Sequence, residues 1–381
     1  MVTLRVGALL PGSGFVPFLA SDLAAALELG LREGGIDPDL AVEAGAFNAD
    51  HKVVAAKLQD LCLKHRVDVL VAPLNVALAS PLADLLEGER VPLVVPSLGE
   101  DVWFADATRS SLFVNNFHLW RSAWMCGYAG AGRFGPSACT LIALHDGGYG
   151  MAFAFGLGLE ANNGRLLQLA VTHQASRTED PSPFISAVTA QNPDFIWALH
   201  SGKEAISLLT AYRALGCGIP LMGLLPLVDV PVLDAVGETA VGIPYVSAWP
   251  PPTDAHERFV TAFHRVTGHA AHPYALLAYE CGHLIADAAR RLPGGRPDRD
   301  ALPDALHDAA FDGPRGRIAF DHRGRETTTP LYLREIVRGD DGRPVSGDAT
   351  VLDLPPLLDE HYALAGKNLV KQGWVNPYLC G

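Results

Sequence analysis

The first loop of the chain has the composition of a ligand-binding loop. The apolar residues 6–10 are followed by Pro11-Gly12-Ser13-Gly14-Phe15 and then by a helical pattern. A buried strand would deliver this loop to the edge of a sheet, and small residues would let a ligand approach the backbone. The N–H groups that begin the next helix would face that ligand. We therefore expect Ser13 and Phe15 to lie at a site for an anion or a polar carbonyl group.

Polar side chains also follow later apolar runs. Asn75 comes after residues 67–72, Ser97 and Leu98 come after residues 91–95, and His200 ends the run 195–199. Ser97 could hold a carboxylate or amide oxygen, or it could only cap the next helix, which stabilises a helix by about 1 kcal/mol. Asn75 could face a ligand or only satisfy its own turn. A lone histidine such as His200 is more often a hydrogen-bonded structural residue than a ligand.

The sequence contains none of the motifs typical of common catalytic sites. It has no GxSxG elbow, no P-loop and no HExxH motif. The helical spacing of His256, His264, His269 and His272 should scatter them over solvated helix faces rather than around a metal ion. The six cysteines form no CxxC pair, so most should be buried small apolar residues. We therefore predict a protein without catalytic residues, cofactor or metal.

Length and charge limit the possible partners. At 381 residues the chain exceeds the roughly 250–300 residues of a single core, which predicts two domains. A net charge of −13 argues against nucleic acid and anionic membranes as partners. No run reaches the about 18 apolar residues of a membrane span, so we expect no direct membrane insertion. The first residues show no basic segment followed by an apolar one, and both an exported and a cytoplasmic protein fit this composition.

Apolar runs alternate with helical patterns along most of the chain. The expected strands are residues 4–10, 40–46, 67–72, 91–95, 112–115, 139–144, 166–171, 195–199, 220–224 and 241–246. The expected helices between them are residues 17–33, 51–65, 76–87, 117–131, 150–162, 183–191 and 203–215. The rest of the chain is expected to contain helices at 254–267, 273–291 and 302–310, a turn and strand within 311–321, a strand at 331–337 and Pro-rich turns. This alternation is typical of parallel sheets covered by helices on both faces.

Six segments in this order resemble the type I periplasmic binding proteins, in particular the branched-chain amino-acid-binding group and the related amide-sensing regulators. They read VGALLPGSG, VDVLVAPLNVALASP, VPLVVPSLGE, LHDGGYG, PDFIWALHSGKE and FDGPRGRIAFDHRG. The resemblance implies an α/β fold of two doubly wound parallel-sheet lobes joined by three crossing strands, with a ligand in a cleft that closes by a hinge. We place one lobe at residues 1–116 and 248–325 and the other at 117–247 and 326–381. The hinge crossings are then expected near residues 115–116, residues 247–248 and Gly324.

The resemblance also implies roles for individual residues. Tyr149 matches a tyrosine that packs on the ligand, and Asn75 stands where amino-acid binders carry a serine. Amino-acid binders keep a glutamate for the ligand's ammonium in the loop that here contains Leu225, and an unpaired buried ammonium costs several kcal/mol. The ligand is therefore expected to be a carboxylate or amide with an apolar or aromatic body, unless Asp146 or Glu100 supplies the missing charge.

His118 at the first crossing could add a donor, and rings such as that of Trp249 could make the pocket apolar. The predicted ligand-binding residues are Ser13, Phe15, Asn75, Ser97, Leu98, His118, Tyr149, His200, Leu225 and Trp249. We predict a periplasmic solute-binding receptor that passes a small-molecule ligand to the membrane permease of an ABC transporter. The alternative is a cytosolic ligand-sensing regulator of the amide-sensor type that acts with a regulatory protein, and an enzyme comes third.

Overall fold

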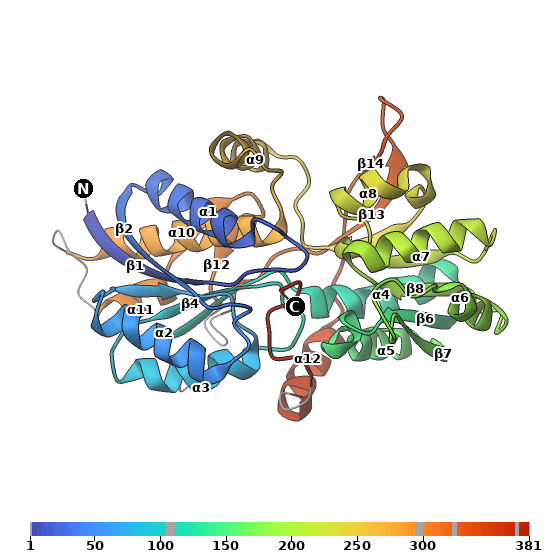
Figure 1. The fold of residues 1–381 in the computed structure, drawn as a ribbon, viewed down its shortest axis with the longest axis horizontal. Coiled ribbons are helices and arrows are strands. Elements are labelled where there is room, and N and C mark those ends of the chain that lie inside the picture. Colours follow the sequence, from blue (N-terminus) through green and yellow to red (C-terminus); the bar gives the residue numbers. More distant parts are fainter. Residues whose placement is uncertain (1, 104–110, 294–299, 322–325, 370–372, 381) are drawn as a thin grey trace.

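The computed structural model of the protein describes residues 2–103, 111–293, 300–321, 326–369 and 373–380. Two α/β lobes lie side by side along the long axis of the molecule, and residues 373–380 return to the junction between them (Figure 1). Each lobe is built around its own sheet.

The first lobe contains a parallel five-stranded sheet of order β2-β1-β3-β4-β5. Its strands are β1 (Val2–Leu10), β2 (Ile36–Ala44), β3 (Val69–Val71), β4 (Leu93–Ser97) and β5 (Leu112–Asn116). All residues of β3 and β4 are buried, as expected for strands covered on both faces. Val6 and Ala8 of β1 join one core cluster, and Leu9 joins the cluster on the opposite face.

Helices cover both faces of this sheet. The helix pair α1 (Leu19–Glu33) and α10 (Pro273–Arg291) packs on one face, and α2 (His51–Leu63) and α3 (Val76–Glu87) pack on the other. In α1 the buried residues recur at helical spacing and form one stripe that faces α10 and the sheet. Further elements beside α10 are α9 (Asp254–Thr267), α11 (Leu302–His307) and the hairpin β11 (Ala310–Gly313) and β12 (Gly316–Ala319).

The second lobe contains an eight-stranded mixed sheet. Its parallel part has the order β7-β6-β8-β9-β10, and β13, β14 and β15 add an antiparallel edge. The strands are β6 (Ser137–Ala143), β7 (Arg165–Thr172), β8 (Phe195–Leu199), β9 (Leu221–Leu224), β10 (Pro244–Ser247), β13 (Tyr332–Arg338), β14 (Pro344–Ser346) and β15 (Thr350–Val351). The antiparallel edge is a feature that the strand and helix alternation did not predict.

Two groups of helices cover the second sheet. One group contains α4 (Leu119–Phe134) and α5 (Met151–Ala161), and α12 (Pro356–Leu369) packs against both of these helices. The other contains α6 (Ser182–Thr189), α7 (Gly202–Ala214) and α8 (Val230–Val236). Short 3₁₀ turns lie at η1 (Asp146–Gly148), η2 (Leu225–Leu227) and η3 (Gly237–Ala240).

The two parallel sheets share one strand order. Numbered within its own lobe, each sheet reads 2-1-3-4-5, so the order reverses between β1 and β3 in one lobe and between β6 and β8 in the other. Ligands of open α/β sheets bind beyond the carboxyl ends of the strands at such a switch point. The loops that follow β1 and β6 touch, because the rings of Phe15 and His145 lie 4.9 Å apart. The two switch points therefore face one another.

The chain passes between the lobes three times. It leaves the first sheet after β5, returns after β10, and leaves again between β12 and β13. The first and third passages run together: Val114 pairs with Glu326, and the Asn116 N–H donates to Thr327 Oγ1 at 2.9 Å. Gly324, expected at the third hinge crossing, lies outside the described residues.

Most predicted elements exist, and several have the predicted bounds. α3, α9, α10 and β8 begin and end where the sequence pattern places them. Two predictions near the end of the chain are wrong. Residues 310–319 form a two-stranded hairpin rather than one strand, and α12 replaces part of the expected Pro-rich turns. Pro356 begins α12, and proline is well tolerated in the first turn of a helix, so Pro-Pro here marks a helix start.

Candidate functional site

The loop after β1 reaches across to the second lobe. The Ser13 hydroxyl accepts hydrogen bonds from the N–H groups of Phe15 and Val16, both at 3.0 Å, and donates to the Leu379 carbonyl. The Phe15 ring lies under the Arg177 guanidinium, 4.5 Å from its carbon atom, and against His145. Both predicted residues therefore lie at the junction of the two lobes.

The loops after β3 and β4 use their polar side chains mainly to hold themselves together. Asn75 caps α3, since its Oδ1 accepts from the Ala77 N–H at 2.9 Å, and its Nδ2 donates to Asp101 Oδ2 at 2.8 Å. The Ser97 hydroxyl accepts from the N–H of Gly99 and from the Trp103 indole, both at 3.0 Å. Asn75 is therefore a helix cap, whereas no helix begins directly after Ser97 in the described residues, and its hydroxyl closes a turn instead of capping a helix.

Two predicted histidines are buried in structural networks. His200 Nε2 lies 2.8 Å from Thr172 Oγ1, and burial together with the neighbouring His173 lowers the pKa of His200 well below its ordinary value. His118 Nε2 lies 2.8 Å from the Thr327 carbonyl, which ties the first and third passages between the lobes. Burial also lowers the pKa of His118, so both rings are neutral at pH 7.

Tyr149 lies at the site and contacts residues from the end of the described chain. Its side chain is only 5% exposed, its ring meets the Tyr378 ring edge-on at 5.1 Å, and its hydroxyl donates to Asn376 Oδ1 at 3.4 Å. The Tyr149 ring therefore packs on a residue of the chain itself, and its contact with a ligand stays a prediction.

A small apolar cavity lies between the lobes. Its volume is about 60 Å³, and it brings together two predicted residues, Leu98 of the first lobe and Leu225 of the second. Its other lining residues are Val16, Phe117, Leu119, Pro226, Asp229, His272, Pro273, Tyr274 and Leu379. This volume is far below the roughly 300–1,000 Å³ of most small-ligand sites.

Residues 373–380, here called the C-terminal segment, lie between the two lobes and contact both of them. Tyr378 is fully buried: its hydroxyl donates to Asp146, its carbonyl accepts from the Tyr274 hydroxyl, and its N–H donates to Glu100 Oε1 at 3.3 Å. Asp146 follows β6, whereas Glu100 and Tyr274 belong to the first lobe. One aromatic residue is therefore held by polar groups of both lobes, in a place that we call the interlobe site.

Two buried carboxyl groups flank this site. Burial, together with the neighbouring Asp101 carboxylate, raises the pKa of Glu100 to about 8. Burial raises the pKa of Asp146 to about 7 despite the Tyr378 and Ser201 hydroxyls beside it. Among the residues that the structure describes, Glu100 Oε2 and Asp146 Oδ2 have no hydrogen-bond partner. Each is an acceptor, or a donor when protonated, that a bound molecule could satisfy.

The sequence patterns do not indicate Tyr378 or Asp229 as residues of the site. Tyr378 occupies it, and Asp229 lines its cavity with a pKa raised to about 6 by burial. Tyr274, which donates to the Tyr378 carbonyl, is one of several aromatic residues that the sequence places near the cleft. Asp229 lies four residues after Leu225, where only apolar residues had been noted. An apolar, aromatic ending such as Trp374-Val375-Asn376-Pro377-Tyr378 is the signal that could have indicated a buried terminal segment.

Trp249 is placed away from the interlobe site. Its ring packs edge-on against His256 at 5.4 Å, and its N–H donates to Ser247 Oγ at 2.9 Å. The expectation of solvated histidines is confirmed for the exposed His264 and wrong for the other three, because His256 is buried and both His269 and His272 contact the buried Asp22, at 2.7 and 3.2 Å. Packing of α9 and α10 against α1 explains both differences.

Within the described ranges, no group of three or more His, Cys, Asp or Glu side chains is arranged to hold a metal ion. No described helix combines the length and the apolar composition needed to cross a membrane. None of the six cysteines, all of which lie in the described ranges, forms a disulfide, and five of them are buried, as the sequence predicts for most of them.

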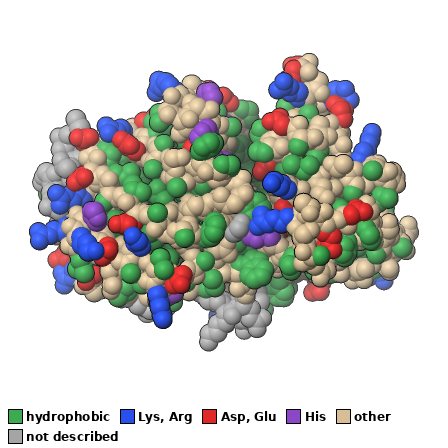
Figure 2. Space-filling model, viewed as in Figure 1, with side chains coloured by type: hydrophobic (Ala, Val, Ile, Leu, Met, Phe, Trp, Pro, Cys, Tyr) green, Lys and Arg blue, Asp and Glu red, His purple; other side chains and the backbone are tan. Residues whose placement is uncertain are grey.

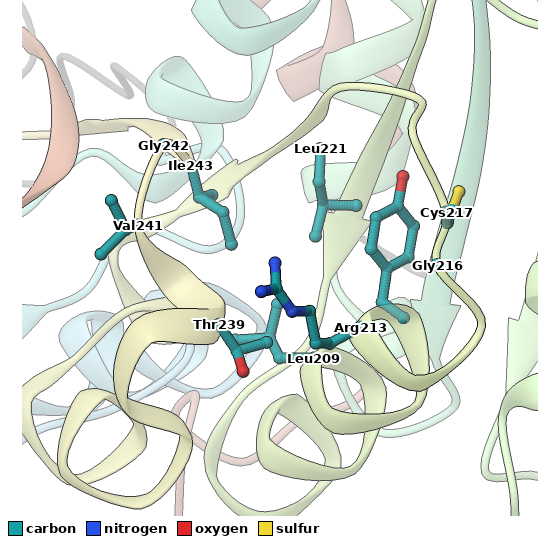
Figure 3. Close-up of a pocket in the computed structure, with 10 residues that line it drawn as sticks. Leu209, Arg213, Gly216, Cys217, Leu221, Thr239, Val241, Gly242 and Ile243 are labelled. Carbon is teal, nitrogen blue, oxygen red and sulfur yellow. The ribbon is translucent and has the colours of Figure 1, made fainter.

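A larger hollow lies at the opposite end of the second sheet. It has a volume of about 340 Å³ and is lined by residues that precede β9 and β10 rather than follow them. Figure 3 shows the Arg213 guanidinium extending between Leu221 and the segment from Thr239 to Ile243. None of the predicted site residues lines this hollow.

On the face drawn in Figure 2, acidic and basic side chains are interspersed, and Lys, Arg and His side chains gather where the two lobes meet. The acidic net charge therefore does not form a single acidic surface on this face.

Comparisons with known proteins agree with this architecture. A family model described as periplasmic binding protein matches residues 3–343. A Leu/Ile/Val-binding protein homolog 6 of Brucella melitensis is 23% identical over 352 residues, which are 89% of each chain. A substrate-binding protein of an ABC transporter from Sphaerobacter thermophilus has a TM-score of 0.78 at 23% identity, over 92% of this chain and 98% of that one. A solute-binding protein of R. palustris in complex with 4-hydroxybenzoate has a TM-score of 0.76 at 18% identity, over 93% and 98%. The chain therefore belongs to the periplasmic binding protein family and, within it, to the type I group that includes the branched-chain amino-acid-binding proteins.

Proposed function

We propose that this protein is the solute-binding receptor of an ABC-type importer and binds a small carboxylate or amide with an apolar or aromatic body at the interlobe site. The observation that carries the proposal is the position of Tyr378: a buried aromatic ring with polar atoms on both sides is held by groups of both lobes. A site that accepts a tyrosine of the chain itself has the shape and the polar groups for a free aromatic or apolar solute.

The polar groups of the site suit an amide or a carboxyl group. The hydroxyls of Tyr274 and Ser13 now donate to carbonyl oxygens of the C-terminal segment, so they can donate to a ligand oxygen. Glu100 and Asp146 now accept from an N–H and an O–H group, so they can accept from an amide nitrogen. When protonated, either carboxyl group can instead donate to a ligand carboxylate.

Protonation of the acids decides between a zwitterion and a neutral or anionic ligand. Glu100 and Asp146 both lie at the site, so either of them, when ionised, could pair with the ammonium group of an amino acid. However, a pKa of about 8 keeps Glu100 mostly uncharged at pH 7, and Asp146 is then only about half ionised. A neutral acid offers no countercharge to a buried ammonium, so the proposal favours ligands without one.

The names of the relatives suggest which compounds to compare as ligands. One is called a Leu/Ile/Val-binding protein homolog, and another was crystallised with 4-hydroxybenzoate. We propose titrating the purified chain by calorimetry with 4-hydroxybenzoate, benzamide, 4-methylpentanoate and L-leucine. The last two have the same branched apolar body and differ in the ammonium, so they form a matched pair.

The expected result is one-to-one binding of at least one of the first three compounds, with 4-methylpentanoate bound more tightly than leucine. Tighter binding of leucine would show that an ionised acid serves the ammonium. Absence of binding by all four compounds would contradict the proposed ligand class.

The proposed setting is the periplasm, with a membrane permease as the partner that receives the solute. The family match and the substrate-binding proteins among the structural neighbours support this setting over a sensing role in the cytosol. We propose no chemical step at the site, so the bound compound should be recovered unchanged after prolonged incubation with the protein.

A further inference from the structure

We propose that the C-terminal segment, Gly373–Cys380, is a built-in occupant of the interlobe site that leaves when a solute enters. This inference rests on the proposed function and concerns the regulation of the same site. The family match ends at residue 343, so the segment lies beyond the part of the chain that the match covers.

The segment is attached to both lobes by its own atoms. On the first lobe, Leu379 accepts from Ser13, and Tyr378 bonds to Tyr274 and Glu100. On the second lobe, the Trp374 indole donates to the His145 carbonyl at 2.8 Å, and the Trp374 N–H donates to the Gly148 carbonyl at 2.8 Å. It therefore bridges the lobes as a bound solute would.

The loop after β6 is shaped to receive the segment. A Cβ on Gly148 would lie 1.7 Å from the indole nitrogen of Trp374, so only glycine leaves room for this ring. The Tyr149 and Tyr378 rings are perpendicular within a few degrees, at an interplanar angle of 86°, which is a favourable edge-to-face arrangement. The loop proposed to bind the solute thus binds the segment with the same residues.

The segment and a solute compete for one space. With the segment in place, the remaining cavity has about 60 Å³, and Leu379 forms part of its wall. Sites for small organic ligands usually have about 300–1,000 Å³. Tyr378 and Cys380 are fully buried at this position, so a solute with a six-membered ring can enter only after they leave.

The segment is also built to be released. Trp374 and Val375 are each 43% exposed, so its first residues face solvent while Tyr378 and Cys380 are buried. Tyr378 and Cys380 belong to the buried core, so release must expose both side chains. Because the competent state is only a fraction of the population, the apparent affinity for a solute is reduced by that fraction.

Cys380 provides a direct measure of release. It is free and fully buried, and burial raises the pKa of its thiol to about 12, so alkylation should be slow while the segment is seated. Alkylation of the full chain is followed by peptide mass spectrometry with and without 4-hydroxybenzoate at saturation. Cys126 and Cys281, buried in α4 and α10, are internal controls for global opening.

We expect the solute to accelerate alkylation of Cys380 about tenfold or more, with the two control thiols unchanged. Slower alkylation of Cys380 on binding would mean that the segment stays as a wall of the site, which would overturn the proposal. In Tyr378→Ala, Cys380 should react rapidly without any solute, and an unchanged rate would show that Tyr378 does not hold the segment.

Affinity provides the second readout. Tyr378→Ala should bind 4-hydroxybenzoate about tenfold or more tightly than wild type, because the competitor no longer fills the site. Tyr378→Phe loses only the hydrogen bond to Asp146 and should gain about two- to tenfold. Tyr212→Phe is the matched control, since that hydroxyl donates to the Ile219 carbonyl at the far end of the second lobe. Weaker binding by Tyr378→Ala would overturn the proposal.

The two proposals fail in different ways. If wild type binds the solute while Cys380 stays unreactive, the displacement is refuted and the receptor function stands. If Tyr378→Ala exposes Cys380 but binds none of the four compounds, release of the segment stands and the proposed ligand class is refuted.

Discussion

Glu100 and Asp146 are the buried carboxyl groups that bond to Tyr378 from the two lobes. The sequence indicates both as possible partners for a ligand ammonium, but it does not show that burial raises the pKa of both carboxyl groups. Their raised pKa values arise from packing between lobes, which no local pattern encodes. Asn75 illustrates the converse, since a bond to its own backbone, the local alternative to a ligand contact, is the one that its Oδ1 makes.

These two acids predict a pH dependence of stability. A carboxyl group whose pKa is raised on folding binds protons more tightly in the folded state, so stability falls as pH rises from its ordinary pKa to the folded one. Burial lowers the pKa of six histidines, His118, His145, His173, His200, His256 and His283, and these have the opposite effect until the pH is about one unit above their ordinary value of 6.5. Between pH 7.5 and 8.5 the acids dominate, and the free energy of unfolding should fall by roughly 1 kcal/mol.

Urea unfolding at the two pH values checks this expectation. Glu100→Gln should remove most of the decline, whereas Asp180→Asn, which changes an exposed carboxylate with a lowered pKa, should leave it intact. A wild-type stability that is flat or rises over this range would contradict the assignment.

Tyr149 is the residue on which the ligand contact is expected to depend most. Tyr149→Ala should weaken solute binding by about 2 kcal/mol or more, because a buried aromatic wall loses apolar contact and exclusion of water. Ser201→Ala, which changes a small buried side chain that begins α7, should cost much less. Calorimetry in the Tyr378→Ala background separates this contact from the one that Tyr149 makes with the C-terminal segment. Equal affinities with and without Tyr149 would remove it from the site.

Helices and strands were largely predictable because hydrophobic periodicity determines them locally. α3, α9 and α10 were predicted to the residue, since an Asn, Thr or His cap precedes each helix and an apolar stripe follows. The misses are elements that depend on distant partners. The hairpin of β11 and β12 pairs within itself beside α10, and α12 packs on α4 and α5, so neither has a strong signal of its own.

Glycine substitutions can test how closely α1 and α10 pack. A Cβ on Gly30 would lie 2.1 Å from the Tyr279 carbonyl oxygen, so Gly30→Ala must separate the two helices. We expect it to destabilise the protein by about 1–3 kcal/mol. A Cβ on Gly156, in α5, would meet nothing within 4 Å, so Gly156→Ala should stabilise by about 0.5–1 kcal/mol. Thermal unfolding of both variants checks this, and a shift of the same sign in both would contradict the packing argument.

At the scale of the whole molecule, two sheets of equal strand order face one another and the chain crosses between them three times. The sequence predicted the lobes and the type of site, because strand ends and glycine-rich loops are local features. It could not predict that the C-terminal segment occupies the site, because that contact joins Tyr378 to Asp146 and Glu100, more than two hundred residues earlier. The proposed lobe boundaries and hinge positions remain predictions.

Release of the segment should loosen the two lobes. In Tyr378→Ala without solute, the bridge between Asp146 and Tyr274 is absent, so we expect a larger radius of gyration than in wild type. Saturating solute should restore the compact form by hinge closure. Small-angle scattering measures both states, and profiles that coincide within error would count against hinge motion.

A crystal structure can show directly whether the solute binds between the lobes. The crystals would contain saturating 4-hydroxybenzoate, or whichever of the four compounds binds with the highest affinity. We expect ligand density between the loop after β1 and the loop after β6, in contact with Tyr149, with Tyr378 displaced. Density in the hollow beside Tyr212 and Arg213, with Tyr378 still seated between Asp146 and Tyr274, would contradict it.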